Sequence, residues 1–378
     1  MSWRVPFVDF PRQWHLQRDS LMPIIERTLA QGDLIMRQQL VDFEAHLAAF
    51  VGVAHAVGVS NCTDGLRLLA HALDVGPGGE VLTVSHTFVA SISPFALRGA
   101  TPILVDIGED HLMDPGALAE LLGGQPPAGG ASSRLVVPVH LNGRACDMAA
   151  ICQAAGDAGA IVIEDAAQAL GAKVGGRSAG AFGLASAFSF YPAKILGALG
   201  DGGAVLTDDA ELAGRLRSLR DHGRVTKTTL EGWGYNCRLD NLQAAVLDWR
   251  LTQLPKWINR RRSLARRYDE QLAGVPGLTI PAGPDAGAGR LDVYQNYVVS
   301  VDGRDDLVAR LAERGIETLV SWPVPLHHQP GLGLDGWSLP ATEFASDHVV
   351  SLPMHVQLDD WQVDYVCDQL KEFLGGKP

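Results

Sequence analysis

The sequence lacks the cysteine pattern of a disulfide-stapled or zinc-binding module. Its 378 residues include five cysteines, an odd number, and none belongs to a Cys-x-x-Cys pair. This usage argues against a disulfide framework and against a zinc ribbon. It is typical of proteins kept in a reducing compartment, so we expect a cytoplasmic protein.

An excess of positive charge is also missing. There are 31 Lys and Arg against 43 Asp and Glu, which gives a formal net charge of −12. Nucleic acids and anionic membranes attract clustered Lys and Arg, so we expect neither as a partner. No apolar stretch approaches the roughly 20 residues that span a bilayer. The first ten residues lack the basic start and apolar run of a signal peptide.

Hydrophobic residues, 47% of the chain, are plentiful enough to fill a large core. Apolar residues at three- and four-residue steps predict a helical region over 14–51. Short, near-continuous apolar runs follow, separated by helical segments, and they predict strands at 80–83, 102–106, 135–140, 161–164, 187–190 and 204–207. This alternation predicts an α/β fold with a doubly wound, mostly parallel sheet. Ligands bind such sheets beyond the carboxyl ends of their strands.

The composition and the pattern of the sequence change near residue 251. An Arg-rich helical segment at 257–272 is followed by a Pro/Gly/Asp-rich stretch at 276–289, which resembles a linker or long loop. Strand-like and helical segments then continue to the end. We predict a large domain over 1–250 and a smaller C-terminal α+β domain over 251–378. The arginines of 260–267 are interpreted as a solvated helix face.

Two segments place reactive side chains at the ends of predicted strands. The first, VIEDAAQ at 162–168, contains Glu164 and Asp165, and the second, FSFYPAK at 188–194, ends in Lys194. Pyridoxal 5′-phosphate needs a lysine that forms a Schiff base and later shuttles a proton. It also needs a carboxylate at its pyridine nitrogen. Lys194 and Asp165 meet both needs if their strands are neighbours, although Asp165 could instead cap a following helix and Glu164 could be only a structural partner.

Two places could bind the phosphate of such a cofactor. Ser189 stands at the end of its predicted strand. The polar turn NCTDG at 61–65 opens a predicted helix at 66–73. Backbone amides at a helix start bind phosphate well.

The strings EDAAQALGA, FSFYPAK…LGALGDGGAV and GYNCRLDNLQAAV together resemble the DegT/DnrJ/EryC1/StrS family. These are pyridoxal-phosphate-dependent sugar aminotransferases of the aspartate aminotransferase fold, fold type I. The resemblance runs from about Val5 to Leu374. It implies an aminotransferase with this cofactor, and the retained Lys194 favours transamination over dehydration, since dehydrating relatives carry a His there.

The resemblance also implies roles for individual residues. Lys194 matches the Schiff-base lysine, Asp165 the partner of the pyridine nitrogen and Gln168 the residue near the ring hydroxyl. Phe88 matches the aromatic that stacks on the ring, although most Phe residues are simple core. The matched phosphate contacts are Thr63, Asp64 and Ser189. Asn236 matches an asparagine that reaches the phosphate of the neighbouring subunit, which implies a homodimer with shared active sites.

The resemblance implies glutamate as the amino donor and a nucleotide-linked keto-deoxy sugar as the acceptor. Gln168 and the GDGG segment at 200–203 resemble members that act on 3-keto more than on 4-keto sugars. Tyr191 and His327 are candidate substrate contacts. Leu170 stands where sugar-modifying members often carry a His, and the segment 293–296 stands where many relatives carry a His near the substrate.

Other interpretations concern the same motifs. The acceptor could be an aminocyclitol ketone, or the chain could be a regulatory binding protein that kept the fold. The GDGG segment fails the spacing of a dinucleotide fingerprint, which disfavours a nicotinamide-dependent dehydrogenase. His327 and His328 have no third ligand at a sensible spacing, so no metal is expected.

Overall fold

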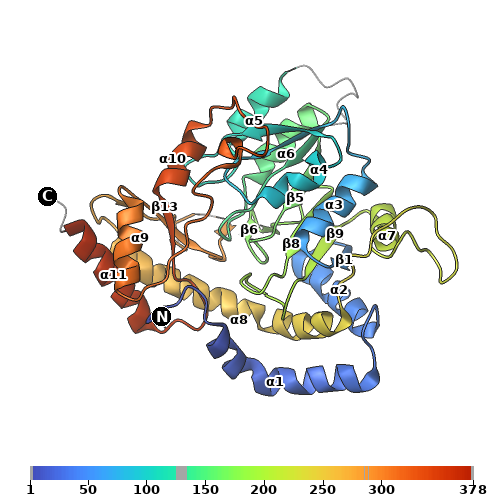
Figure 1. Cartoon of the computed structure of the whole chain (residues 1–378), viewed down its shortest axis with the longest axis horizontal. Helices are drawn as coiled ribbons and strands as arrows, with labels where there is room; N and C mark the ends of the chain where they lie inside the picture. The colour runs from blue at the N-terminus through green and yellow to red at the C-terminus, as the bar shows by residue number, and fades with distance from the viewer. Residues whose placement is uncertain (1–2, 125–133, 285, 288, 376–378) are drawn as a thin grey trace.

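A seven-stranded sheet forms the centre of the larger part of the molecule (Figure 1). The computed structural model describes residues 3–124, 134–284, 286–287 and 289–375. The strands, in their order across the sheet, are β1 (His55–Val59), β9 (Gly203–Thr207), β8 (Ala185–Ser189), β5 (Ile161–Asp165), β4 (Arg134–Val137), β2 (Glu80–Val84) and β3 (Thr101–Val105). Only β9 runs against its neighbours in this sheet. The predicted doubly wound, mostly parallel sheet is therefore confirmed.

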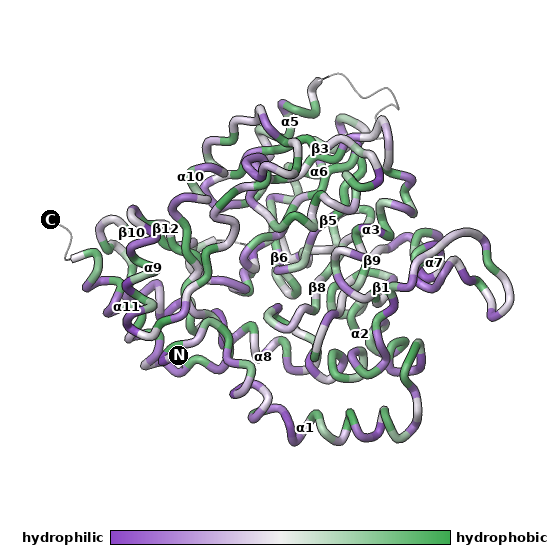
Figure 2. The backbone as a smooth tube through the Cα atoms, in the orientation of Figure 1, coloured by the Kyte–Doolittle hydropathy of each residue, from purple (hydrophilic) through white to green (hydrophobic). Residues whose placement is uncertain are grey.

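Both faces of the sheet are buried, which explains the near-continuous apolar strands. Ala187 and Val205 pack on one face with α3 (Cys62–Ala72) and α7 (Ala210–Leu219). The alternate residues Phe188 and Leu206 pack on the other face with α2 (Gln38–Val51) and α8 (Asn241–Leu272). Successive side chains of a strand point to opposite faces, so a strand covered on both sides needs apolar residues at every position. Figure 2 shows the central strands as mainly hydrophobic.

The predicted strands all correspond to observed strands, but β1 was not predicted. The helical region predicted at 14–51 is two helices, α1 (Phe10–Gln31) and α2. Gly32 ends α1 with a φ of 70°, a left-handed conformation that glycine adopts without a steric penalty. Helix α1 then lies along α8 (Figure 1).

The C-terminal part contains a small antiparallel sheet of β10 (Leu278–Thr279), β12 (Tyr297–Val301) and β13 (Val349–Leu352). Helices α9 (Arg304–Glu313) and α11 (Asp360–Gly375) pack beside it. The predicted linker at 276–289 includes β10, and its residues 285 and 288 lie outside the described residues. Further elements are η1 (Val89–Ser91), α4 (Ser93–Ala96), α5 (Pro115–Leu122), α6 (Met148–Asp157), β6 (Lys173–Val174), β7 (Arg177–Ser178), β11 (Arg290–Leu291), η3 (Leu326–His328) and α10 (Pro340–His348). None of the described helices combines the length and hydropathy needed to cross a membrane.

Helix α8 connects the two parts of the molecule without a break. Its N-terminal part, up to Ile258, contributes Leu251, Leu254 and Ile258 to the core under the large sheet. Its second half contributes Leu264 and Tyr268 to the core of the C-terminal part. The division predicted between residues 250 and 251 therefore falls inside a helix, and the core changes only after Ile258.

Candidate active site

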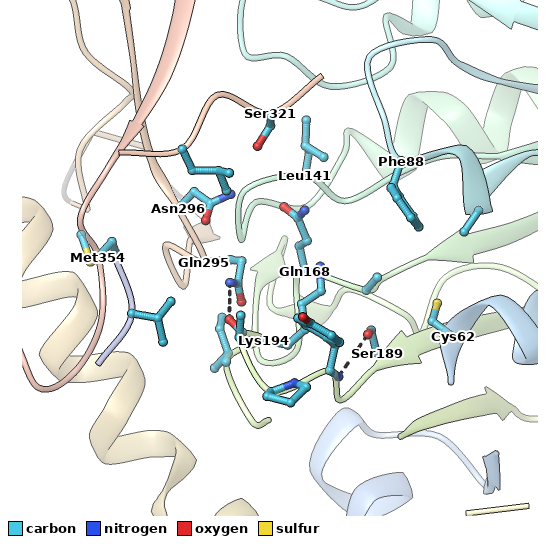
Figure 3. Close-up of a pocket in the computed structure, with 18 of the residues that line it drawn as sticks. Cys62, Phe88, Leu141, Gln168, Ser189, Lys194, Gln295, Asn296, Ser321 and Met354 are labelled. Carbon is cyan, nitrogen blue, oxygen red and sulfur yellow. Dashed lines mark hydrogen bonds between the residues drawn. The ribbon is translucent and has the colours of Figure 1, made fainter. Parts of the chain in front are cut away.

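A cavity of about 960 Å³ lies beyond the carboxyl ends of β5 and β8, bounded on its other side by segments of the C-terminal part (Figure 3). Its position agrees with the rule that ligands bind open α/β sheets at this edge. Most of the site residues predicted from the sequence line it: Thr63, Asp64, Phe88, Asp165, Gln168, Ser189, Tyr191 and Lys194. The fold thus brings together side chains that are separated by up to 131 positions in the chain (63 to 194).

Asp165 is held as a buried carboxylate at the end of β5. It is only 5% exposed. Its Oδ2 accepts a hydrogen bond from the Ser91 hydroxyl at 2.7 Å, and its Oδ1 accepts one from the Ala167 backbone N–H at 3.1 Å. These two hydrogen bonds fix the orientation of the carboxylate at the edge of the cavity. A turn rather than a helix follows Asp165, so helix capping does not account for it.

Lys194 reaches the same cavity from a short loop after β8. Strands β5 and β8 are neighbours, with Asp165 opposite Ala187, so the condition set by the sequence is met. Gln295 supports the loop because its Nε2 donates to the carbonyl of Ala193 at 2.9 Å. Burial lowers the pKa of Lys194, and the charge of Asp165 opposes part of this shift. A lowered pKa leaves more of the amine neutral, which is the form that attacks a carbonyl.

Helix α3 begins at Cys62 rather than at the predicted Leu66, so residues 62–65 form its first turn. Asn61 caps the helix, since its Oδ1 accepts from the Asp64 backbone N–H at 2.8 Å. The Asp64 carboxylate is itself engaged by Ser60, by Asn61 and by Arg67 at 2.7 Å, so it holds the helix start in place. A Cβ on Gly203 would lie 2.5 Å from the Asn61 carbonyl carbon, so only glycine permits this close approach of β9.

Phe88 and Gln168 line the cavity in different ways. Phe88 is 61% exposed, so it is not a core residue and its ring is available to a ligand. Gln168 is oriented by its Oε1, which accepts from the Asn142 backbone N–H at 2.8 Å. Ser189 ends β8, and its Oγ accepts from the Tyr191 backbone N–H at 3.3 Å.

Two predicted site residues lie elsewhere. Asn236 is exposed and does not line the cavity. His327 is 2% exposed, also outside the cavity, and its ring contacts Ser85 Oγ at 2.7 Å and Glu343 Oε1 at 3.3 Å. Its own partners therefore occupy both ring nitrogens, and nothing places it against a substrate in the cavity.

The argument that His327 and His328 lack a third ligand is wrong. Helix α10 brings Glu343 close, and one ligand atom from each of the three side chains lies within 4.8 Å of the others. His327 and Glu343 already satisfy each other through their hydrogen bond. The cluster is thus explained by its internal contacts.

Apart from the segment 293–296, the sequence prediction missed the cavity wall formed by the C-terminal part. Its residues include Trp257, Arg261, Gln295, Asn296, Ser321 and His355. Arg261 is 6% exposed, so the interpretation of the 260–267 arginines as a solvated face is wrong for this residue. Helical periodicity could have found it, because Ile258, Ala265 and Tyr268 share its buried side of α8.

The groups around the cavity fit pyridoxal phosphate. Lys194 supplies an amine of lowered pKa, Asp165 a buried carboxylate and Phe88 an open aromatic face. Hydroxyls of Thr63 and Ser189, with the start of α3, supply donors of the kind that bind phosphate. The fold and the site together define a pyridoxal-phosphate-dependent transferase of fold type I.

Comparison with known proteins identifies the family. The model of the DegT/DnrJ/EryC1/StrS aminotransferase family matches residues 17–371, and the chain belongs to this family. It is similar to the dTDP-3-amino-3,4,6-trideoxy-α-D-glucose transaminase of Streptomyces venezuelae, with 40% identity over 98% of this chain and 96% of the relative. It is also similar to a pleiotropic regulatory protein of Geobacillus stearothermophilus, with 37% identity over 98% of each chain. The crystal structure of S. venezuelae DesV superimposes with a TM-score of 0.93, 39% identity and full coverage of both chains.

Proposed function

We propose that this aminotransferase moves an amino group from glutamate to a nucleotide-linked keto-deoxy sugar, and that the sugar carries its ketone at C3. The observation that carries the proposal is the cavity in which Lys194 and Asp165 meet. Its volume, about 960 Å³, is at the upper end of the range of roughly 300–1,000 Å³ for small-molecule sites. Such a volume suits a cofactor together with a large second ligand.

The relatives support the class of acceptor. The S. venezuelae relative is named for a dTDP-linked sugar with its amino group at C3, and that name favours a 3-keto over a 4-keto acceptor. Gln168 is a residue in which the chain resembles family members that act on 3-keto sugars. Its side chain lines the cavity and is oriented by the backbone N–H of Asn142.

The residues of the chain would divide the work as follows. When bound, pyridoxal phosphate supplies an electron sink that stabilises negative charge developing at the α-carbon of the donor. The Asp165 carboxylate would keep the pyridine nitrogen protonated. The Nζ atom of Lys194 would hold the cofactor covalently and, once released, would accept the proton from the donor's α-carbon. Phe88 would hold the ring in plane, and Thr63 and Ser189 would bind the phosphate.

The visible spectrum of the purified protein, before and after glutamate is added, tests the donor and the reaction. We expect a yellow protein that bleaches with glutamate and regains its colour when a keto sugar nucleotide is supplied. A yellow protein that does not respond to glutamate would contradict the proposed donor. Comparing 3-keto and 4-keto sugar nucleotides as acceptors then tests the ketone position.

We also propose that the active protein is a homodimer with shared sites. Asn236 is exposed and outside its own cavity, and it follows a segment that projects from the body after α7 (Figure 1). This segment exposes Leu230 by 62% and Trp233 by 93%, as a surface that meets a second copy would. Asn236→Ala should then weaken retention of the cofactor without unfolding the chain. Unchanged cofactor affinity, or a monomer in analytical ultracentrifugation, would count against the shared site.

Two alternatives are tested by the same assays. An aminocyclitol ketone in place of the sugar nucleotide would show itself in an acceptor screen. A regulatory role is favoured by the name of the G. stearothermophilus relative and disfavoured by the intact set of Lys194, Asp165 and Ser189.

We further propose a reducing, cytoplasmic compartment for the protein, which suits its cysteines, since all of them are free thiols.

A further inference from the structure

Three polar atoms on one wall of the cavity are buried without a hydrogen-bond partner in the described part of the chain. They are Arg261 Nε, Gln295 Oε1 and His355 Nε2, and all three residues line the cavity. The residues are 6%, 8% and 4% exposed. Buried polar atoms are nearly always paired, so a group of unpaired ones facing a cavity indicates a ligand that completes them.

Arg261 carries a charge that no acidic side chain balances. Its Nη1 donates to the backbone carbonyls of Tyr294 at 2.8 Å, Gln295 at 3.2 Å and Met354 at 2.9 Å, which are all neutral groups. Within the described residues it has no carboxylate partner. Burial lowers its pKa to about 10, so it remains protonated at neutral pH. A buried cation without a counter-charge is unfavourable unless an anion binds beside it.

Other buried arginines of the chain show the contrast. Arg220 pairs with Glu44, Arg134 with Glu80 at 2.8 Å, and Arg304 with Asp305. Arg250 also lacks a carboxylate within the described residues, but it does not line the cavity. Arg261 is thus distinguished by combining an unbalanced charge with a place on the cavity wall.

Of the other two unpaired atoms, the one on Gln295 is an acceptor. Gln295 donates through Nε2 to the Ala193 carbonyl, which leaves its Oε1 as an acceptor. The ring of His355 has Nδ1 3.3 Å from Gln357 Oε1 and also interacts with the Pro6 backbone. Burial and the nearby charge of Arg261 lower the pKa of His355 to about 4, so the ring is neutral. The wall therefore offers a cationic donor, an amide acceptor and a neutral imidazole.

This wall stands beside the reacting lysine. Gln295 contacts the residue before Lys194, and Arg261 contacts the backbones of Gln295 and Met354, which precedes His355. Figure 3 shows Gln295 next to Lys194, with Met354 on the same side of the cavity and Phe88 and Ser189 across from it. A ligand on this wall would be within reach of Lys194 and opposite the residues proposed to hold the cofactor.

We infer that Arg261 binds an anionic oxygen group of the substrate, while Gln295 accepts a hydrogen bond from a neighbouring O–H or N–H group of the same molecule. The inference rests on the proposed function, in which both substrates are anionic. The donor carries carboxylates and the acceptor carries a diphosphate. Their shared chemistry is a negatively charged oxygen group, which matches the planar donor geometry of guanidinium.

Two probes distinguish the sources. Glutarate is a dicarboxylate that cannot donate an amine, and UDP carries a nucleoside diphosphate without the keto-deoxy sugar. Their affinities for the cofactor-loaded protein are measured by calorimetry for the wild type, Arg261→Gln and the control Arg304→Gln. Arg304 is equally buried and also donates to backbone carbonyls, those of Ser346 and Val349, but it lies outside the cavity.

We expect Arg261→Gln to weaken the binding of one probe by about tenfold to a hundredfold, as the loss of a charge-assisted contact does. Arg304→Gln should leave both affinities unchanged. Weakened glutarate binding would assign Arg261 to the donor, and weakened UDP binding would assign it to the acceptor. Wild-type affinity for both probes in a folded Arg261→Gln variant would overturn the inference.

A milder variant covers the case in which Arg261→Gln does not fold. Arg261→Lys keeps the cation but has fewer donors, so a severalfold loss for the same probe is expected, and wild-type affinities would again overturn the inference. The same experiments distinguish failure of this inference from failure of the proposed function. A wild type that binds a probe through Arg261 but transfers no amino group would refute the reaction and leave the anion site standing.

Discussion

Glu164 and Asp165 are adjacent acidic residues, and we predict that their removal has opposite consequences. The side chain of Glu164 is fully buried and accepts four hydrogen bonds. Its Oε1 accepts from the backbone N–H groups of Phe182 and Gly183, and its Oε2 accepts from Gly180 N and His140 Nε2, at distances between 2.6 and 2.8 Å. The Cys146 N–H donates to Nδ1 of His140 at 3.0 Å, so the proton of that ring is on Nε2 and points to Glu164.

The loss of stability expected for Glu164→Gln follows from the number of hydrogen-bond donors around the side chain. In Glu164→Gln, one oxygen still accepts two N–H groups, but an NH₂ group now meets two further donors. Two hydrogen bonds to a charged group are lost, at about 1.5–3 kcal/mol each, so the free energy of unfolding should fall by about 3–6 kcal/mol. That is a large share of the roughly 5–15 kcal/mol of a typical protein.

Asp165→Asn should affect catalysis instead. The Asn carbonyl can keep the bond from Ala167 N, and the Ser91 hydroxyl can turn to accept from the new NH₂ group, since a hydroxyl both donates and accepts. The free energy of unfolding should therefore change by less than about 1 kcal/mol. The charge offered to the pyridine nitrogen is lost, so kcat should fall at least about 100-fold, or roughly 2.7 kcal/mol of activation free energy.

Urea unfolding of the cofactor-free variants and a coupled glutamate assay of the cofactor-loaded ones separate the two effects. The reasoning would be refuted if Glu164→Gln unfolded within about 1 kcal/mol of the wild type. It would equally fail if Asp165→Asn turned over at close to the wild-type rate.

Three further predictions concern the lysine, the glycine beside α3 and a buried histidine. Lys194→Ala should abolish transamination and leave the near-ultraviolet circular dichroism unchanged, because within the described residues its side chain makes no hydrogen bond or ion pair; near-normal turnover would contradict the mechanism. Gly203→Ala should weaken cofactor binding and lower the melting temperature, since its Cβ would meet the Asn61 backbone. The control Gly214→Ala, in the middle of α7 with open space around its Cβ, should leave cofactor binding unchanged and raise the melting temperature slightly, because Ala favours a helix over Gly. Burial lowers the pKa of His86 to about 3. The unfolded chain then binds a proton below pH 6.5 that the folded chain refuses, so stability should fall by up to about 1.4 kcal/mol per pH unit as pH drops from 6.5 towards 3, and His86→Phe should flatten that slope in urea titrations.

The strands of the large sheet could be predicted because burial on both faces requires a continuous run of apolar residues, which is visible in the local sequence. A strand such as β5 is apolar at nearly every position and ends at the polar residue that reaches the site. The sequence pattern of strand β1 is weaker, because Gly58 interrupts its apolar run. Packing favours glycine there, since a Cβ would approach Leu40 Cδ1 to 2.8 Å and Leu239 Cβ to 3.2 Å. A contact of this kind between distant residues is invisible in the local pattern.

The same distinction explains what was predicted of the site. Asp165, Ser189 and Lys194 stand at strand ends, so topology alone implies that they converge. Arg261 and His355 belong to segments far along the chain, and only the packing of the C-terminal part against the large sheet brings them to the cavity. The density of arginines over 260–267 further concealed that one of them faces inwards.

Helix α8 gives this arrangement a functional consequence. It runs unbroken from the core under the large sheet to the core of the C-terminal part, and Arg261 lies after the point where the cores change. The chemical groups are therefore attached to the large sheet and Arg261 to the C-terminal part, and both helix α8 and the hydrogen bond from Gln295 to Ala193 hold the two walls together. Substitution of Arg261 should consequently change the affinity for substrate while the absorbance of the cofactor at Lys194 stays as in the wild type. A change in that absorbance would show that the two walls are not independent.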